Sequence, residues 1–176
     1  RIREVHDMSA PANYDRAVDA ARLLGLPLMC LHSVTDNLVD RHLSRLVERE
    51  GPRTVGDVVD LLQGQPEHQH AARNNNPPEV YVGDRKRRAG KVVVRMTGGT
   101  SGPKELYEKL ADAGVGTAVF MHIPESHLEE ARKHHMNVVI AGHVASDSMG
   151  MNLLADQLEE RGVEVTPCSG FIRVRR

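Results

Sequence analysis

The fold is decided by a stretch near the C-terminus that reads Asn137-Val-Val-Ile-Ala-Gly-His-Val-Ala-Ser-Asp-Ser-Met-Gly-Met-Asn-Leu-Leu-Ala-Asp-Gln-Leu-Glu-Glu-Arg-Gly162. Its apolar run, Val138 to Ala141, is typical of a buried strand. Ser146 is the expected N-cap of a helix that ends at Gly162. His143 and Asp147 therefore lie where a strand passes into a helix, and α/β sheets build binding sites at this edge.

An earlier segment repeats the pattern. The apolar run Pro27-Leu-Met-Cys-Leu-His32 predicts a second buried strand that ends at His32. Ser33-Val-Thr-Asp36 follows, and a helix is expected from Asn37. If the two strands share a parallel sheet, both corners open on the same edge. His32, Asp36, His143 and Asp147 are then candidate ligands of a divalent metal, and their mixed imidazole and carboxylate chemistry suits Zn, Fe, Mn, Ni or Co without selecting among them.

Each of these positions also has a simpler interpretation. The helix dipole alone favours an aspartate in a first turn, and most histidines bind nothing. His32 fits equally well as a histidine that orients a ligand without binding the metal. The repetition of the whole corner is what favours a metal site. His122, at the end of a predicted strand from Gly116, is a reserve member of the site and a candidate for proton transfer.

The rest of the chain alternates strands with helices, which predicts a layered α/β fold. Gly64 to Pro78 is predicted to be a loop with solvated His68 and His70, and it marks the place of any internal boundary. The Gly-rich segment Thr97 to Pro103 suits either an anion cradle or a tight turn. Further strands are expected at Glu79–Val82, Val92–Met96, Val163–Thr166 and Phe171–Val174, and further helices begin at Ser9 or Asn13, at Thr54, at Lys104 and at Pro124.

Composition narrows the class of protein. The chain has 176 residues, 40% of them apolar and only 3% aromatic, which suits a globular protein with an aliphatic core. Its net charge of −1 gives no general attraction to polyanions. No apolar run is long enough to span a bilayer and no signal peptide is visible, so a cytoplasmic location is expected, with Cys30 in the core and no disulfide to Cys168. The one basic run, Arg85 to Lys91, lacks interleaved aromatic residues, which favours a solvated loop over nucleic-acid binding.

Three segments together resemble a known family. Cys30-Leu-His-Ser-Val-Thr-Asp36, the Gly-rich segment from Thr97 and Ala141-Gly-His-Val-Ala-Ser-Asp147 resemble the Nif-three-like family (NGG-one interacting factor, YbgI type), whose members include proteins described as a second type of GTP cyclohydrolase. The resemblance implies a layered fold with a mixed, largely parallel sheet flanked by helices. It also implies a dinuclear centre, with two divalent transition metal ions per subunit, inside a ring-shaped homo-oligomer, commonly a hexamer.

The resemblance assigns roles to the candidate ligands. Asp36 would match a carboxylate that bridges or binds the metals, and His143 and Asp147 would match a histidine and an acidic ligand. The family usually has Glu at the last position, and Asp is one methylene shorter. A pair of histidines that precedes the first corner in the family has no counterpart before His32. One alternative is an incomplete site. The other, which we expect, is that residues 1–176 are the larger, C-terminal part of a longer Nif-three-like unit.

The leading functional hypothesis is a metal-dependent, hydrolase-like or cyclohydrolase-like enzyme acting on a nucleotide-like or other small anionic substrate. His122 or His32 would assist proton transfer. The alternative is a non-enzymatic scaffold or regulatory protein that stores, senses or transfers metal, because both functions need the same ligands. A nucleic-acid partner and a membrane partner are disfavoured.

Overall fold

The computed structural model describes residues 15–96 and 102–176, which divide into two units. The first unit extends to Leu31, and its described part contains helix α2, Arg16–Leu23, with an ion pair between Asp19 and Arg22 of 3.2 Å. The second unit, His32–Arg176, contains the sheet and all the candidate ligands. The expected helix caps at Ser9 and Asn13 lie outside the described residues.

The second unit is built on a four-stranded sheet with the order β1-β4-β3-β2. Strands β2, β3 and β4 are parallel, and β1 runs antiparallel to β4. This arrangement confirms the predicted mixed, largely parallel sheet. The strands are β1 Glu79–Val82, β2 Lys91–Arg95, β3 Val115–Phe120 and β4 Asn137–Ile140.

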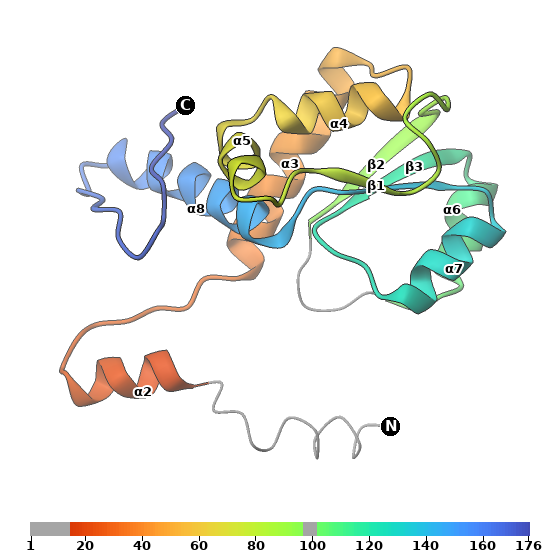
Figure 1. Cartoon of the computed structure of the whole chain (residues 1–176). Helices are drawn as coiled ribbons and strands as arrows, with labels where there is room; N and C mark the ends of the chain where they lie inside the picture. Colours follow the sequence, from red (N-terminus) through yellow and green to blue (C-terminus); the bar gives the residue numbers. More distant parts are fainter. Residues whose placement is uncertain (1–14, 97–101) are drawn as a thin grey trace, which may run out of the picture. The chain divides into compact units, whose positions relative to one another are not determined.

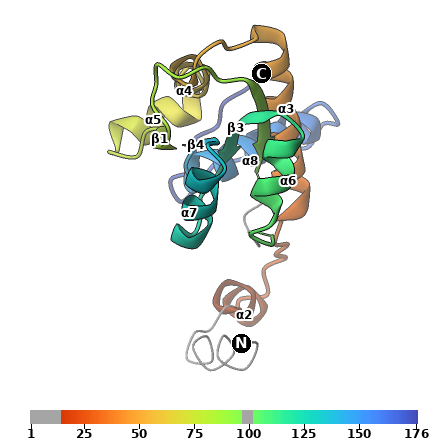
Figure 2. The same ribbon diagram turned by 90° about the vertical axis from the view of Figure 1, so that its right-hand side faces the viewer.

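Helices cover both faces of this sheet (Figures 1 and 2). Val119 and Val139 face one core with α3, α4 and α8, whereas their neighbours Ala118 and Val138 face a second core with α6 and α7. This alternation is the two-residue period of strands buried on both sides. None of the helices in the described ranges is long and apolar enough to cross a membrane. The helices of this unit are α3 Ser33–Glu50, α4 Val55–Gln63, α5 Pro66–Arg73, α6 Leu106–Asp112, α7 Glu125–Lys133 and α8 His143–Glu159.

Helices α3 and α8 cross in close contact because α8 has a glycine at the crossing point. A Cβ atom at Gly150 would lie 2.6 Å from the carbonyl oxygen of Thr35, closer than real contacts allow. Glycine therefore permits the backbone of one helix to touch the other. Thr35 precedes Asp36, so this contact brings the start of α3 close to the first two turns of α8.

The expected N-terminus of α4 is confirmed in detail. The Asp57 amide donates to the Thr54 hydroxyl over 3.1 Å, and the Thr54 amide donates to the Asp57 carboxylate over 2.9 Å. This reciprocal pair is the capping box that the sequence predicts.

Three predicted strands are wrong. Residues 27–32 form no strand, and Cys30 is exposed and not in a core. Val163–Thr166 and Phe171–Val174 are also irregular. A strand needs a hydrogen-bonded neighbour, and the C-terminal segment has instead a side-chain partner, because the Val174 amide donates to the Asn152 side chain over 2.9 Å.

The predicted loop from Gly64 to Pro78 is also corrected, because it contains helix α5. Pro66 occupies the first turn, where a missing amide hydrogen costs nothing. Glu67, His68 and Ala71 then form one buried face at helical spacing, so His68 is fully buried and not solvated. The polar composition of this segment hid its helical period.

Candidate metal centre

The first His-x-x-x-Asp corner is the start of α3. His32 is the N-cap residue, and its carbonyl oxygen accepts hydrogen bonds from the Thr35 hydroxyl at 2.7 Å and from the Asp36 amide at 3.0 Å. These bonds fix Asp36 in the first turn, where only 4% of it is exposed. Its carboxylate lies 3.6 Å from Nδ1 of His32, whose side chain remains 62% exposed. The sequence predicted a helix from Asn37, but the helix already begins at Ser33.

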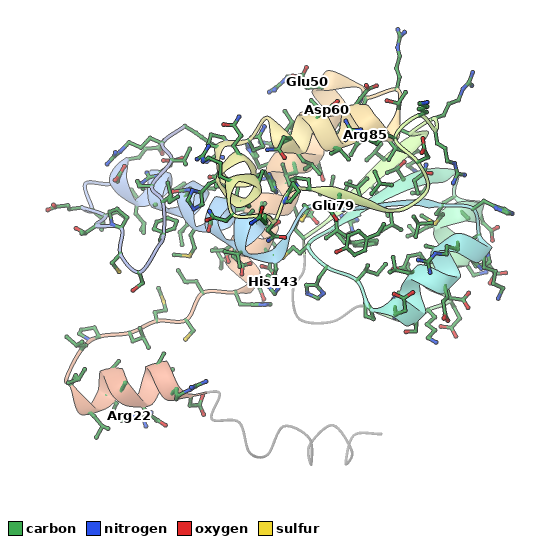
Figure 3. The ribbon with its side chains drawn as sticks, in the orientation of Figure 1. Arg22, Glu50, Asp60, Glu79, Arg85 and His143 are labelled. Atoms are coloured by element: carbon green, nitrogen blue, oxygen red, sulfur yellow. The ribbon has the colours of Figure 1, made fainter. Side chains whose placement is uncertain are left out.

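The second corner is the start of α8. Gly142 has φ of 93°, a conformation that glycine adopts without strain, and it turns the chain from β4 into the helix. The helix already begins at His143, so the predicted N-cap Ser146 is inside it and donates its hydroxyl hydrogen to the Gly142 carbonyl over 2.6 Å. Nε2 of His143 lies 3.4 Å from the Asp147 carboxylate, one turn farther along. Figure 3 shows His143 at this end of α8.

His122 joins the second corner from the neighbouring strand. It follows β3, which is parallel to β4, and the carboxyl ends of parallel strands meet at one edge of the sheet. The ring centroids of His122 and His143 are 4.9 Å apart, with an angle of 35° between the ring planes. His122, predicted as a reserve member of the site, therefore lies beside His143, one of the principal candidates.

The other four candidates all act electrostatically on the Asp147 carboxyl. Partial burial raises the pKa of Asp147, whose side chain is still about half exposed, and the negative charge of Asp36 raises it further. The imidazoles of His143, His32 and His122 act on the same carboxyl and lower its pKa, but they do not cancel the rise. These interactions reach Asp147 from α3, from the end of β3 and from its own helix, so the two corners and His122 occupy one region.

The chemistry of these donors fits a divalent transition metal. Three imidazoles and two carboxylates are the ligand types that such ions share. A buried carboxylate such as Asp36 beside a second carboxylate is electrostatically costly unless a cation accompanies the pair. Within the part of the chain that the structure describes, however, no three of these groups already stand close enough to enclose an ion. The structure brings the donors together without arranging them in a coordination shell.

The remaining sequence motifs lie elsewhere. In the basic run, Arg85 donates to Asp60 of α4 over 2.7 Å (Figure 3). Arg87 donates to the His135 carbonyl over 3.1 Å. These two arginines hold the loop before β2 against its neighbours. Of the Gly-rich segment, residues 97–101 lie outside the described residues. His70, which was predicted to be solvated, is in contact with the Asn74 side chain at the end of α5.

Sequence reasoning missed a cavity of about 370 Å³ beside His122. Arg95, the last residue of β2, lines it together with His122 and side chains of α6 and β3. The sequence did contain one indication of this cavity, because Arg95 and His122 both lie at the ends of neighbouring parallel strands. The apolar walls from α6 had no such signal, since they are indistinguishable from core residues in the sequence.

Comparison with known proteins shows a strong similarity to a solved structure. No family model and no curated protein matches the chain. A NIF3 superfamily protein from Sphaerobacter thermophilus has a crystal structure with 33% sequence identity and a TM-score of 0.65, over 87% of this chain and 57% of that one. The chain thus spans little more than half the length of that relative.

Two further structures are more distant. Protein ybgI, of unknown function, has 21% identity over 62% of this chain and 40% of that one, with a TM-score of 0.42. A Bacillus cereus protein related to NIF3 has 17% identity over 69% of this chain and 33% of that one, with a TM-score of 0.41.

Proposed function

From the premise that this chain belongs to the NIF3 superfamily, we propose that it binds divalent transition metal ions at His32, Asp36, His143 and Asp147, with His122 beside them for proton transfer. We further propose that it uses them to hydrolyse a small anionic, nucleotide-like substrate. Two ions per subunit are expected. The observation that supports this proposal is the shared influence of the other four groups on the Asp147 carboxyl.

The protein side of the chemistry follows from the positions of these groups. Asp36 is buried and held by its helix, so it is the rigid anionic donor of the site. His143 and Asp147 are more exposed and stand where a substrate would arrive. A divalent ion, when bound, would polarise an anionic substrate and lower the pKa of water. His122 is close enough to His143 to hold or deliver a proton at this edge of the sheet.

A second candidate function is a scaffold that takes up and releases metal without catalysis. The exposure of His32 and His143 favours it, because about half or more of each side chain is open to solvent. Exposed ligands allow a metal ion to enter and leave a site, whereas a structural metal site is closed.

We also propose that the chain assembles into a ring-shaped homo-oligomer, a hexamer by family resemblance. Helix α8 supports this proposal because Val144, Met151 and Leu158 are all exposed. They recur every seven residues and therefore lie along one side of the helix. Exposed apolar side chains that form a row of this kind are typical of a protein interface.

The decisive experiment measures bound metal. The chain is loaded with Zn, Mn, Fe or Ni, desalted and examined by elemental analysis. Asp36→Asn and Asp147→Asn should lose most of the metal, whereas Asp40→Asn, one turn farther along α3, should keep it. Equal metal content in all variants would refute the site. A nucleotide hydrolysis screen with the retained metal then separates the enzyme from the scaffold.

A further inference from the structure

The cavity beside His122 lies on the face of the sheet that α6 and α7 cover. Its volume of about 370 Å³ is within the range of small-molecule pockets, about 300 to 1,000 Å³. Most of its wall is apolar, and two polar side chains, Arg95 and His122, complete the lining. The principal apolar side chains are Leu106, Tyr107, Leu110, Ala118, Phe120 and Ile123.

Two aromatic rings give the cavity a defined shape. Tyr107 and Phe120 stand edge to face, with centroids 6.3 Å apart and an angle of 65°. Behind them, His127 packs against Tyr107 at 5.6 Å and 87°, which fixes the tyrosine ring. Burial raises the pKa of Tyr107 to about 12, so this wall carries no charge near neutral pH. Such walls favour a planar ring, because aromatic pairs gain energy beyond the area that they bury.

Arg95 supplies a positive charge at the cavity. It bonds the Asp40 carboxylate at 3.4 Å and the Val94 carbonyl at 3.0 Å, both through Nη1. The other guanidinium nitrogens of Arg95 make no hydrogen bond to any residue in the described ranges, and they are available to an anion. The pair with Asp40 is long and the Arg95 side chain is mostly exposed, so an incoming anion displaces it at little cost. An arginine also binds a carboxylate or phosphate with two parallel hydrogen bonds.

We propose that this cavity binds a planar aromatic or heteroaromatic ring that carries an anionic group, with the ring beside Phe120 and Tyr107 and the anion at Arg95. The inference rests on the proposed function in one respect: the ring compound is the substrate of the metal centre. His122 provides the connection, since it lines the cavity and lies 4.9 Å from His143. A ligand in the cavity thus borders directly on the candidate metal ligands.

The probe for this site is naphthalene-2-carboxylate. Because the chain contains no tryptophan, Leu106→Trp places a single tryptophan, which can be excited apart from the tyrosines, at the cavity. Leu106 is already partly exposed, so the substitution should be tolerated. Titration with the probe should quench this tryptophan saturably by energy transfer. The control variant Leu158→Trp, on the exposed side of α8, should show no saturable quenching. Equal responses of both variants would overturn the proposal.

The native chain tests the charge requirement without the added tryptophan. The fluorescence of the probe itself gives its dissociation constant, and Arg95→Gln should weaken binding about tenfold, the effect of one lost charged hydrogen bond. The neutral analogue 2-naphthylmethanol should bind both forms equally. Absence of saturable binding to the native chain, or an unchanged affinity in Arg95→Gln, would contradict the assignment.

The cavity and the metal centre can fail separately. In Asp36→Asn, and in the native chain after chelation, naphthalene-2-carboxylate should bind with unchanged affinity because none of the apolar wall is altered. Bound metal without probe binding would overturn only the ring site. Probe binding in a chain that takes up no metal would support the ring site and remove the proposed metal function.

Discussion

The ring of His122 lies 4.9 Å from the ring of His143, although one residue follows β3 and the other begins the helix after β4. Parallel pairing of β3 with β4 produces this neighbourhood, since it aligns Phe120, just before His122, with Ile140, just before the second corner. His122 therefore stands between the apolar cavity and the second His-x-x-x-Asp corner. This position predicts different roles for the two histidines.

Replacing His122 by glutamine should separate catalysis from metal binding. Glutamine keeps a polar group at the position but cannot exchange a proton near neutral pH. We expect metal content close to that of the native chain and a hydrolysis rate lower by about 10²- to 10⁴-fold. His143→Gln, the matched control, should lose metal as well as activity. If His122→Gln loses metal to the same extent as His143→Gln, then His122 is a ligand.

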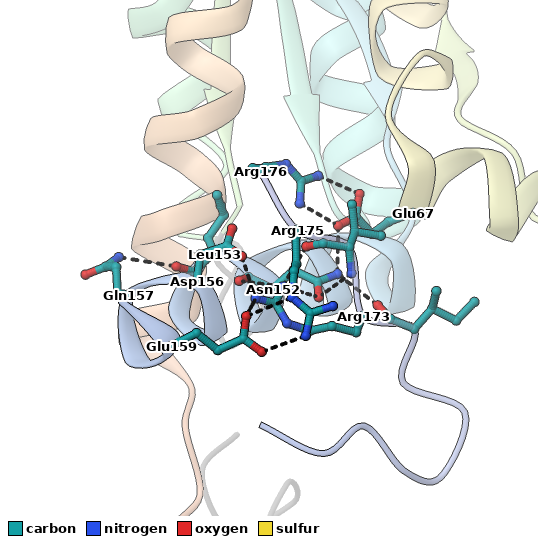
Figure 4. Close-up of polar contacts among 11 residues, drawn as sticks. Glu67, Asn152, Leu153, Asp156, Gln157, Glu159, Arg173, Arg175 and Arg176 are labelled. Atoms are coloured by element: carbon teal, nitrogen blue, oxygen red, sulfur yellow. Dashed lines mark hydrogen bonds and ion pairs between the residues drawn. The ribbon is translucent and has the colours of Figure 1, made fainter. Parts of the chain in front are cut away.

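A buried ion pair between Glu67 and Arg176 anchors the C-terminal segment to α5 (Figure 4). The two guanidinium nitrogens of Arg176 donate to Glu67 over 2.9 and 2.7 Å, and Asn152 of α8 donates to the same carboxylate over 2.9 Å. The Glu67 side chain is only 1% exposed. Arg176→Leu should lower the free energy of unfolding by about 3 kcal/mol, because it leaves a buried carboxylate without its partner.

Arg175 provides the matched control for this substitution. It pairs with Glu159 at 3.0 Å but is largely exposed, so Arg175→Leu should cost less than about 1 kcal/mol in urea unfolding. Adding Glu67→Gln to Arg176→Leu should recover part of the loss, since it removes the unpaired charge. Equal stability of Arg175→Leu and Arg176→Leu would show that the pair does not anchor the segment.

The same pair predicts acid sensitivity. Burial raises the pKa of Glu67, but hydrogen bonds and charge from Arg176, with the bond from Asn152, outweigh burial and leave the pKa below its ordinary value of 4.5. A carboxyl with a lowered pKa stabilises the fold at pH values above 4.5 and loses this contribution as the pH falls through the folded value. Arg176→Leu should flatten this part of the stability profile.

His68 predicts a second loss of stability on acidification, and this loss begins at a higher pH than that of Glu67. It is fully buried, and neither ring nitrogen has a hydrogen-bond partner within the described residues. Burial lowers its pKa from 6.5 to about 4, and the negative charge of Glu67 opposes the shift only in part. The unfolded chain therefore binds a proton that the folded chain excludes, and stability falls as the pH drops from 6.5 towards 4.

Between pH 6.5 and pH 4, the lowered pKa of His68 should decrease the free energy of unfolding by about 3 kcal/mol in all. His68→Phe keeps a ring of similar shape and should reduce the pH dependence in this range, because phenylalanine does not titrate. His70→Gln, at a half-buried position of α5, should leave the dependence as in the native chain. Urea unfolding at several pH values provides the measurement, and an unchanged slope in His68→Phe would contradict the prediction.

Local sequence signals predicted the four strands of the sheet and the second corner, because the relevant forces there are local. Val138 to Ala141 is apolar, and Gly142 follows it where the chain turns, so strand, corner and helix could all be placed. The starts of α3 and α8 were misplaced by a few residues. His32 and Gly142 cap these helices without side-chain hydrogen bonds, and the usual capping residues therefore gave a wrong indication.

Other features depend on partners that are distant in the sequence. Pro27 to His32 is as apolar as a true strand, but its composition does not reveal whether a neighbouring strand exists. Arg176 and Glu67 meet across 109 positions, and no local pattern connects them. The convergence of the two corners likewise depended on a tertiary contact, that of Gly150 with Thr35, which neither helix shows by itself.

The exposed row on α8 predicts an effect on assembly. Met151→Glu places a charge between Val144 and Leu158 on the same side of the helix. A charge that is desolvated in an apolar interface is costly, so the mass in solution should fall towards that of one chain. Light scattering after size exclusion measures it, with the exposed substitution Glu160→Lys as control. An unchanged mass in Met151→Glu would place the interface elsewhere.

Gly150→Ala tests whether the helix contact holds the two corners together. Alanine is the better helix former by about 1 kcal/mol, so a helix that had room would become more stable. Here the new Cβ would lie 2.6 Å from a backbone oxygen and 3.0 Å from a backbone carbon of Thr35, and neither atom can turn aside. The helices must separate, and overpacking of this kind costs about 1 to 3 kcal/mol.

Metal affinity should fall with stability in Gly150→Ala, since separation moves Asp36 away from His143 and Asp147. Gly64→Ala is the control, because its Cβ would approach the Leu61 carbonyl only to 3.3 Å at the end of α4, far along the chain from both corners. We expect little change in its metal content. Zinc titration with a competing chelator, read beside urea unfolding, distinguishes the outcomes. A destabilised Gly150→Ala that binds zinc as tightly as the native chain would show that the corners do not act as one site.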